Sequence, residues 1–239
     1  MPQTAVIAGV GPGLGESLAR QFASEGCRVG LFARSKDYIE ELASDLPDPG
    51  DGIAVPTDLT SIDDIRDGFA TVRAEYGPVD ILINHASSAT WTGLMDSSVE
   101  DFQQAWSVNC RGAFVCSQEA VNDMLETGGG TIIFTGATSA VRSRGGAIGF
   151  TAAKFGARGM AMDIAQEFGP EGIHVAHVVI DGQIDEPGAR AMVSDRDDDT
   201  FLDPDRMAET YWHLVEQDSR DTMPFEVHIT NGPQTTEFI

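Results

Sequence analysis

Short apolar segments alternate with amphipathic helical stretches along most of the chain, and this alternation restricts the fold more than any other feature. A helix between successive strands makes those strands parallel. Strands rich in Val and Ile, without strict polar alternation, are typical of a parallel sheet covered on both faces. We therefore predict one α/β domain over residues 1–239, with a doubly wound sheet of about seven strands. The predicted strands are 4–8, 28–32, 52–56, 79–84, 131–135, 173–180 and 225–230, and the predicted helices are 14–24, 37–46, 62–76, 99–126, 150–168 and 206–217.

A glycine-rich loop joins the first predicted strand to the first helix. Glycines let the backbone turn tightly and approach a diphosphate, while the helix N-terminus offers free N–H groups to the anion. The position between strand and helix is the context that a dinucleotide-binding loop requires. We expect a Rossmann-type domain whose cofactor contacts are Gly9, Gly11, Gly13, Leu14 and Gly15.

The end of the second strand indicates which nicotinamide dinucleotide binds. A carboxylate at this point hydrogen-bonds the ribose 2′-hydroxyl and repels a 2′-phosphate. Here the residues are Ala33 and Arg34. A guanidinium can pair with a phosphate through two hydrogen bonds, so NADP(H) is predicted over NAD(H). An ordinary surface charge is the alternative role for Arg34.

Several short motifs follow in a fixed order and resemble the short-chain dehydrogenase/reductase family over nearly the whole chain. They are Gly-x-x-x-Gly-x-Gly at Gly9, Asp58-Leu59, Asn84-His85-Ala86-Ser87, Asn109 in Val-Asn-Cys-Arg-Gly, and Phe150-x-x-x-Lys154. The resemblance implies a nicotinamide-dependent oxidoreductase. It also implies that Asp58 and Leu59 hold the adenine end, that the backbone from Asn84 to Ala86 lines the adenosine ribose, and that Lys154 binds the nicotinamide ribose. Asn109 would bend its helix and hold a relay water.

The catalytic part of that resemblance is incomplete. Phe150 stands where the family has its Tyr, and Ala137 stands where the family has its Ser. Loss of a general acid typically costs about 10²–10⁴ in rate, and loss of an oxyanion donor about 10²–10³. The standard mechanism is therefore not expected, and the pattern points to an atypical branch of the family.

Two hypotheses remain. In the first, the chain is an oxidoreductase of unknown substrate with a displaced proton donor, for which Thr138 and Asp181 are the leading candidates beside Asn109 and Lys154. Ser139, His177 and Tyr211 are further candidates, although a core role for His177 and a loop-capping role for Asp181 are the favoured alternatives. In the second, the chain is inactive and binds NADP(H) as a redox sensor or interaction module. Lys154 supports cofactor binding under both.

The charge balance excludes other classes of partner. With 38 acidic and 15 basic side chains, the formal charge is −23, which repels nucleic acid and anionic membranes. The acidic residues are spread along the chain, which is typical of a halophile's surface, and a binding face for a cationic partner is the alternative. No His, Cys or carboxylate cluster has metal-ligand spacing, so no metal is expected.

Further features concern location, assembly and the substrate. Three cysteines without Cys-x-x-Cys spacing, and no leader-like or spanning apolar run, predict a cytoplasmic protein. The resemblance implies a homodimer or homotetramer.

Residues 187–221, which contain an acidic run at 195–199, are predicted to form a substrate lid. An apolar pocket lined by Trp91, Met95 and Phe150, with Arg142 and Arg144 nearby, would suit an anionic apolar substrate, although surface ion pairs are the preferred role for both arginines.

Overall fold

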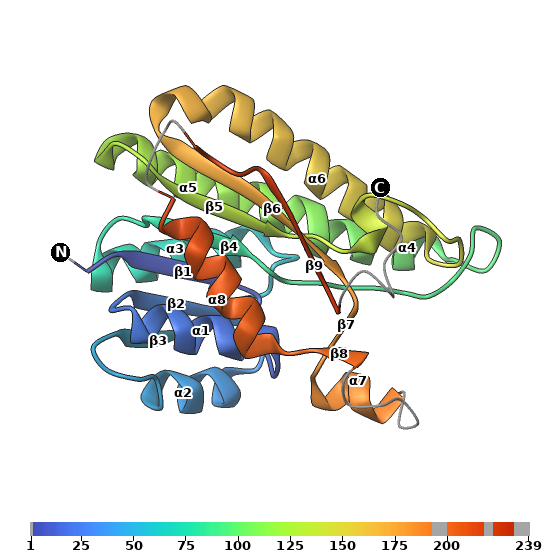
Figure 1. Ribbon diagram of the computed structural model, residues 1–239, viewed down its shortest axis with the longest axis horizontal. Coiled ribbons are helices and arrows are strands. Elements are labelled where there is room, and N and C mark those ends of the chain that lie inside the picture. Colours follow the sequence, from blue (N-terminus) through green and yellow to red (C-terminus); the bar gives the residue numbers. More distant parts are fainter. Residues whose placement is uncertain (1, 193–199, 218–221, 232–239) are drawn as a thin grey trace.

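A seven-stranded parallel sheet forms the centre of the protein (Figure 1). The computed structural model describes residues 2–192, 200–217 and 222–231. The strand order is β3-β2-β1-β4-β5-β6-β9, which confirms the predicted doubly wound sheet. Its strands are β1 (Thr4–Ala8), β2 (Arg28–Ala33), β3 (Asp51–Pro56), β4 (Ile81–Asn84), β5 (Gly130–Thr135), β6 (Ile173–Asp181) and β9 (Glu226–Thr230).

Helices cover both faces of this sheet (Figure 1). On one face the core includes side chains from α1, α2 and α8, and on the other from α3, α5 and α6. The central strands β1, β2, β4, β5 and β6 are buried, as a parallel sheet between two helical layers requires, whereas the edge strands β3 and β9 are only partly buried. The helices are α1 (Leu14–Ser24), α2 (Lys36–Ser44), α3 (Ile62–Tyr76), α4 (Val99–Trp106), α5 (Ala113–Thr127), α6 (Ile148–Phe168), α7 (Pro187–Met192) and α8 (Pro204–Val215).

The strand order reverses beside β1, and this reversal positions the functional cleft. β1 pairs with β2 on one side and with β4 on the other, with Ala8 opposite both Phe32 and Asn84. Chain segments leaving the carboxyl ends of β1 and β4 turn to opposite faces, which opens a crevice between them. The glycine-rich loop and the segment after Asn84 meet there, since the backbone N–H of Ala86 donates to the carbonyl of Ala8 at 2.7 Å.

The long helix expected over 99–126 is interrupted. A π-helical stretch, Ser107–Gly112, separates α4 from α5. Asn109 lies within it, and its side-chain amide donates to the carbonyl of Ala105 at 2.8 Å, one turn earlier. A side chain that enters the backbone hydrogen-bond ladder in this way deforms the helix locally, and π-bulges are frequent at functional sites.

The segment after β6 departs from a simple lid. A short parallel pair, β7 (Gln183–Ile184) and β8 (Phe201–Leu202), was not expected from the sequence. α8 packs on α1, where Trp212 meets Phe22 edge to face at 5.3 Å, so this part of 187–221 belongs to the core layer. The acidic run at 195–199 lies outside the described residues.

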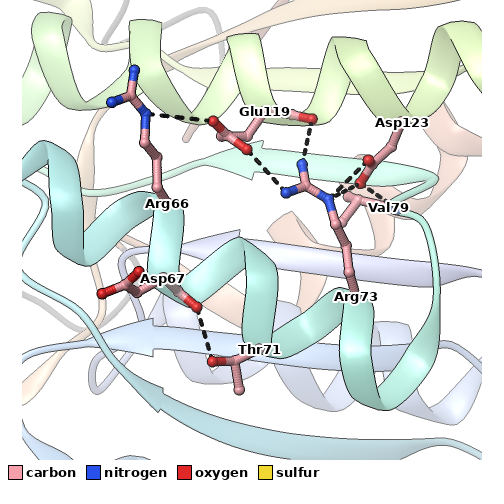
Figure 2. A network of polar contacts seen from close by, with 7 residues as sticks. All are labelled: Arg66, Asp67, Thr71, Arg73, Val79, Glu119 and Asp123. Atoms are coloured by element: carbon pink, nitrogen blue, oxygen red, sulfur yellow. Dashed lines mark hydrogen bonds and ion pairs between the residues drawn. The ribbon is translucent and has the colours of Figure 1, made fainter.

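An arginine-centred polar network ties α3 to α5 and to the start of β4 (Figure 2). Arg73 donates from Nε to both carboxylate oxygens of Asp123, at 2.8 and 3.0 Å, and from Nη1 to Glu119 at 3.0 Å. Asp123 also accepts from the backbone N–H of Val79 at 3.0 Å. All these groups are at least partly buried, so the network fixes the approach of the helices to the sheet. No helix of the described part is long and apolar enough to cross a membrane.

Candidate active site

A cleft of about 760 Å³ lies at the carboxyl ends of the strands. This volume falls in the usual range for a ligand site, roughly 300–1,000 Å³. The cleft brings together residues from the loops after six strands and from α6. Its walls include ten of the residues singled out in the sequence: Gly9, Gly11, Arg34, Asp58, Leu59, Ala86, Ala137, Thr138, Phe150 and Lys154.

The glycine-rich loop has the shape that an anion cradle needs. Gly9 has φ of 112°, and a Cβ there would lie 2.4 Å from the Cα of Ala86, so a larger residue would push the two loops apart. A Cβ on Gly11 would meet no atom within 4 Å, which leaves the backbone open on the cleft side. Gly13, Leu14 and Gly15 shape the turn without forming the cleft wall, and Leu14 is buried in the core.

The part of the cleft beyond the ends of β2 and β3 is polar. Asp58 Oδ1 accepts from the backbone N–H and the hydroxyl of Thr60, at 2.9 and 2.8 Å. These hydrogen bonds, and secondarily the charge of Arg34, lower the pKa of Asp58. Arg34 makes no ion pair with any described carboxylate. A cation and an oriented carboxylate thus face the cleft side by side, beyond the ends of β2 and β3.

Asn84, the last residue of β4, and Ala86, two positions later, face different surroundings. The Asn84 amide turns inward and donates to Ser117 Oγ at 3.1 Å, away from the main cleft. Ala86 and the intervening His85 line the cleft. The structure therefore separates the predicted 84–86 contact into an internal anchor and a cleft wall.

Lys154 is 4% exposed and reaches the cleft from α6. Its Nζ donates to the backbone carbonyl of Thr135 at 2.9 Å, and no described carboxylate pairs with it. Burial lowers the pKa of Lys154 to about 8. The ring of Phe150 stands beside the ammonium, with 5.6 Å from Nζ to the ring centroid, and Trp91 packs on that ring at 5.5 Å. An apolar aromatic surface thus lies next to the lysine.

A small cavity adjoins the cleft beside Lys154. It measures about 10 Å³ and is lined by Lys154, Asn84 and Asn109, among others. Asn109 donates to the carbonyls of Ser88 and Ala105, while the side-chain oxygens of Asn84 and Asn109 are buried and have no partner in the described part of the chain. The space is about what one water molecule needs, and two acceptors face such a position.

Asp181 is fully engaged where β6 ends. Its Oδ1 accepts from Thr138 Oγ1 at 2.7 Å, and its Oδ2 accepts from Arg142 at 2.6 Å. Both carboxylate oxygens act as acceptors, which is the arrangement of an ionised side chain bracing the loop after β5. The geometry favours this bracing role over proton donation by Asp181 or Thr138.

The two remaining candidates are internal. His177 is 1% exposed, and its Nδ1 pairs with Glu226 Oε2 at 3.0 Å, so it is a buried histidine with a carboxylate partner. Tyr211 is completely buried and contacts Thr135 Oγ1 through its hydroxyl at 2.9 Å. Neither side chain forms the cleft wall.

Two further polar residues of the cleft have no role predicted from the sequence. The motif after β4 contains His85, whose Nδ1 lies 3.1 Å from Thr135 Oγ1. Burial, and secondarily the Lys154 charge, lower the pKa of His85 to about 4. Glu186 packs against Gly13, and burial raises the pKa of its carboxyl. No local pattern indicates Glu186, because it is 173 positions away in the sequence from Gly13, which it contacts. His85, in contrast, lies within a motif expected to contact the cofactor, and this position could have indicated it.

Comparison with known proteins identifies the family of this chain. The family described as short chain dehydrogenase matches residues 3–197. The chain belongs to this family. An uncharacterized short-chain type dehydrogenase/reductase of Sinorhizobium fredii is 34% identical over 179 residues, covering 72% of this chain and 71% of its own length. A mutant short-chain dehydrogenase/reductase of Serratia marcescens has a TM-score of 0.85 at 26% identity, covering 95% of this chain and 96% of its own.

One further solved structure shares the fold. A 3-ketoacyl-(acyl-carrier-protein) reductase of Brucella melitensis, complexed with NADH, has a TM-score of 0.85 at 23% identity. The alignment covers 96% of this chain and 97% of that one. The likeness therefore extends over nearly the whole fold.

Proposed function

We propose that the protein is an NADP(H)-dependent oxidoreductase in which Lys154, in place of the absent Tyr hydroxyl, exchanges the proton with the reacting oxygen. The observation that carries this proposal is the state of Lys154. It is a buried ammonium with no carboxylate partner among the described residues, it faces the cleft, and its pKa of about 8 lies close to neutral pH. A general acid works best when its pKa is near the working pH.

The described residues fit the cofactor. The backbone at Gly9, held close to Ala86, and the open backbone at Gly11 would hold its diphosphate at the N-terminus of α1, and Arg34 would pair with a 2′-phosphate. Asp58 and Leu59 would contact the adenine, Ala86 the adenosine ribose, and Lys154 the nicotinamide ribose. Relatives of the same fold have been solved with NADH and with an NADP derivative, which supports a nicotinamide cofactor.

The nicotinamide supplies the hydride when bound. In the reductive direction the ammonium of Lys154 gives a proton to the oxygen of the substrate carbonyl, and Lys154 recovers a proton from solvent. Asn109, with the small cavity beside it, would hold a water on this path. Thr138 and Asp181 would keep the loop after β5 in place, and the rings of Phe150 and Trp91 would exclude water from the reacting carbon.

Fluorescence titration with NADPH and NADH, in molar salt, followed by a screen of carbonyl and activated-alkene substrates, tests the proposal. We expect tight NADPH binding and slow turnover of at least one carbonyl. The matched variant is the double substitution Phe150→Tyr and Ala137→Ser, which restores both hydroxyls. Turnover in the double variant alone would contradict the role of Lys154 and favour a cofactor-binding protein without chemistry, since Phe150 and Ala137 carry no exchangeable proton. If the protein bound neither NADPH nor NADH, both the oxidoreductase and the inactive cofactor-binding protein would be rejected.

We also propose a homo-oligomer with an acidic, salt-tolerant surface in the cytoplasm. Exposed apolar side chains occur on α4, α5 and α6, including Phe114, Leu125, Phe155 and Met162. Apolar area left on neighbouring helices is typical of subunit contacts. Within residues 187–221, we propose that α7 and β8 form the substrate lid, because they lie next to Glu186 and the cleft. Light scattering over a range of salt concentrations tests assembly and salt tolerance together.

A further inference from the structure

A hydrogen-bonded chain leads from the core to the cleft through three side chains. Thr135 Oγ1 lies 2.9 Å from the Tyr211 hydroxyl and 3.1 Å from His85 Nδ1. Tyr211 is completely buried and Thr135 is nearly so. Within the described residues, neither the Tyr211 hydroxyl nor the Thr135 hydroxyl has another partner.

The directions of these two hydrogen bonds follow from counting protons. If His85 Nδ1 carries a proton and donates it to Thr135, then either Thr135 donates to Tyr211 and the Tyr211 proton has no acceptor, or Tyr211 donates to Thr135 and the Thr135 proton has none. A buried donor without an acceptor loses its hydration without compensation. Every buried proton is used only when Tyr211 donates to Thr135 and Thr135 donates to His85 Nδ1. A neutral imidazole then carries its proton on Nε2.

The opposite ring nitrogen of His85 faces a different environment. His85 lines the cleft, and its Nε2 is paired with no described group and is not among the buried unpartnered atoms. Lys154 Nζ donates to the backbone carbonyl of Thr135, the residue whose hydroxyl holds His85. Two donors, one neutral and one charged, are therefore anchored to the same residue at the end of β5.

We propose that Tyr211 and Thr135 lock His85 as the neutral Nε2–H tautomer, and that His85 is the hydrogen-bond donor that the cleft offers to the oxygen of the reacting carbonyl. The second part rests on the proposed function. His85 keeps its proton throughout and stabilises the negative charge that develops on the oxygen, while Lys154 supplies the proton that the oxygen takes up. His85 is a catalytic residue in this scheme, and Thr135 and Tyr211 are positioning residues.

The electrostatics of the site agree with this role. Burial and the nearby Lys154 charge hold the pKa of His85 near 4, so the imidazole stays neutral at neutral pH. A neutral imidazole with a lowered pKa is an effective donor to a carbonyl oxygen in other enzymes. The donor also compensates for Ala137, which has no hydroxyl.

Nitrogen NMR of the ¹⁵N-histidine-labelled protein tests the tautomer without any substrate. His85 is assigned by its loss in His85→Asn. We expect a protonated Nε2 and an unprotonated Nδ1 on His85 at neutral pH. Two buried histidines serve as internal references: His177 Nδ1 faces Glu226 Oε2 at 3.0 Å and must carry a proton, and His174 Nε2 faces the carbonyl of Pro224 at 2.9 Å and must do the same. A protonated Nδ1 on His85 would overturn the proposal.

Tyr211→Phe removes the first donor of the chain and should move His85 towards the Nδ1–H tautomer. Tyr38→Phe is the matched control, because Tyr38 pairs with Glu16 outside the chain and should leave the His85 signals unchanged. Equal spectra for the wild type and Tyr211→Phe would show that the chain does not set the tautomer.

Kinetics on a carbonyl that the wild type reduces test the second part. His85→Phe should lower kcat about 10²–10³-fold, with KM and NADPH affinity little changed, since one oxyanion donor is lost. A loss of NADPH affinity at constant kcat would place the donor on the cofactor and overturn the assignment. If the wild type reduces no carbonyl, the proposed function fails, and the spectrum still decides whether His85 is locked.

Discussion

Basic side chains are used in two different ways in this protein. Between α3 and α5, Arg73 is bonded to the carboxylates of Glu119 and Asp123 (Figure 2). In the cleft, neither Arg34 nor Lys154 has a carboxylate partner among the described residues, and Lys154 donates to the backbone carbonyl of Thr135. The difference is informative because acidic side chains outnumber basic ones by 38 to 15. A basic side chain without a carboxylate partner among the described residues, in a chain so rich in carboxylates, can bind an anionic ligand instead.

The two arrangements have different energetic consequences. A partly buried ion pair stabilises its surroundings chiefly because either partner alone would be left desolvated. A buried ammonium without a counter-charge destabilises the folded state and is typical of functional sites. Substitutions in the α3–α5 network should therefore lower the stability of the fold and leave cofactor binding unchanged. Substitutions of the basic residues in the cleft should impair binding or turnover and leave the stability unchanged or higher.

Lys154→Met should give the largest effect. The substitution keeps the apolar stem and removes the proton donor, so we expect turnover to fall about 10²–10⁴-fold. Thermal stability should be unchanged or higher, because a desolvated charge is removed. Steady-state rates and a melting curve measure both. A large fall in melting temperature would show that Lys154 is structural, like Arg73.

The pH profile of the wild type sharpens the same point. Burial lowers the pKa of Lys154 to about 8, so the ammonium is present below this pH and lost above it. Carbonyl reduction should be fully active well below pH 8 and decline as the pH rises through it. Alcohol oxidation needs the free amine and should rise over the same range. A reduction rate that is flat from pH 7 to 9 at saturating cofactor would contradict the assignment.

Arg34→Ala should weaken NADPH binding about 10–100-fold, the usual worth of hydrogen bonds to a charged group. NADH binding should change little, because NADH lacks the 2′-phosphate. The matched control is Arg111→Ala, since Arg111 donates to the carbonyl of Thr60 and is outside the cleft wall. Equal losses for the two dinucleotides would indicate that Arg34 stacks on the adenine.

Arg73→Met should lower the free energy of unfolding by about 2 kcal/mol, less than a fully buried pair because the Arg73 side chain is 30% exposed. It leaves Glu119 and Asp123 without their shared cation. Urea denaturation gives the stability, and NADPH titration of the folded variant should match the wild type. Weakened binding without loss of stability would remove the contrast between the two regions.

The sequence predicted the sheet well because each strand carries its own signal. The apolar runs and the loop glycines are local patterns in the chain, so the doubly wound parallel sheet and the position of the glycine-rich loop between β1 and α1 could be predicted. The site was predicted only in part. Asp181 faced the correct edge of the sheet, but its pairing with Arg142 depends on a loop conformation that no spacing encodes. His85 is linked through Thr135 to Tyr211, which lies 126 positions further along the chain, in α8.

Glu186→Gln should give the smallest change, and in the opposite direction. A Cβ on Gly13 would lie 2.9 Å from the Glu186 Cβ and 3.4 Å from its Oε2, so this carboxylate stands beside the predicted diphosphate cradle. Removing its charge should tighten NADPH binding a few-fold, with less effect at high salt. Because burial raises the pKa of Glu186, the advantage of the variant should shrink as the pH falls and the wild-type carboxyl becomes neutral. Asp185→Asn is the control, since Asp185 is paired with Arg190. If Glu186→Gln instead weakened binding, Glu186 would belong with the structural carboxylates around Arg73, and the cleft would contain a carboxylate that positions the loop.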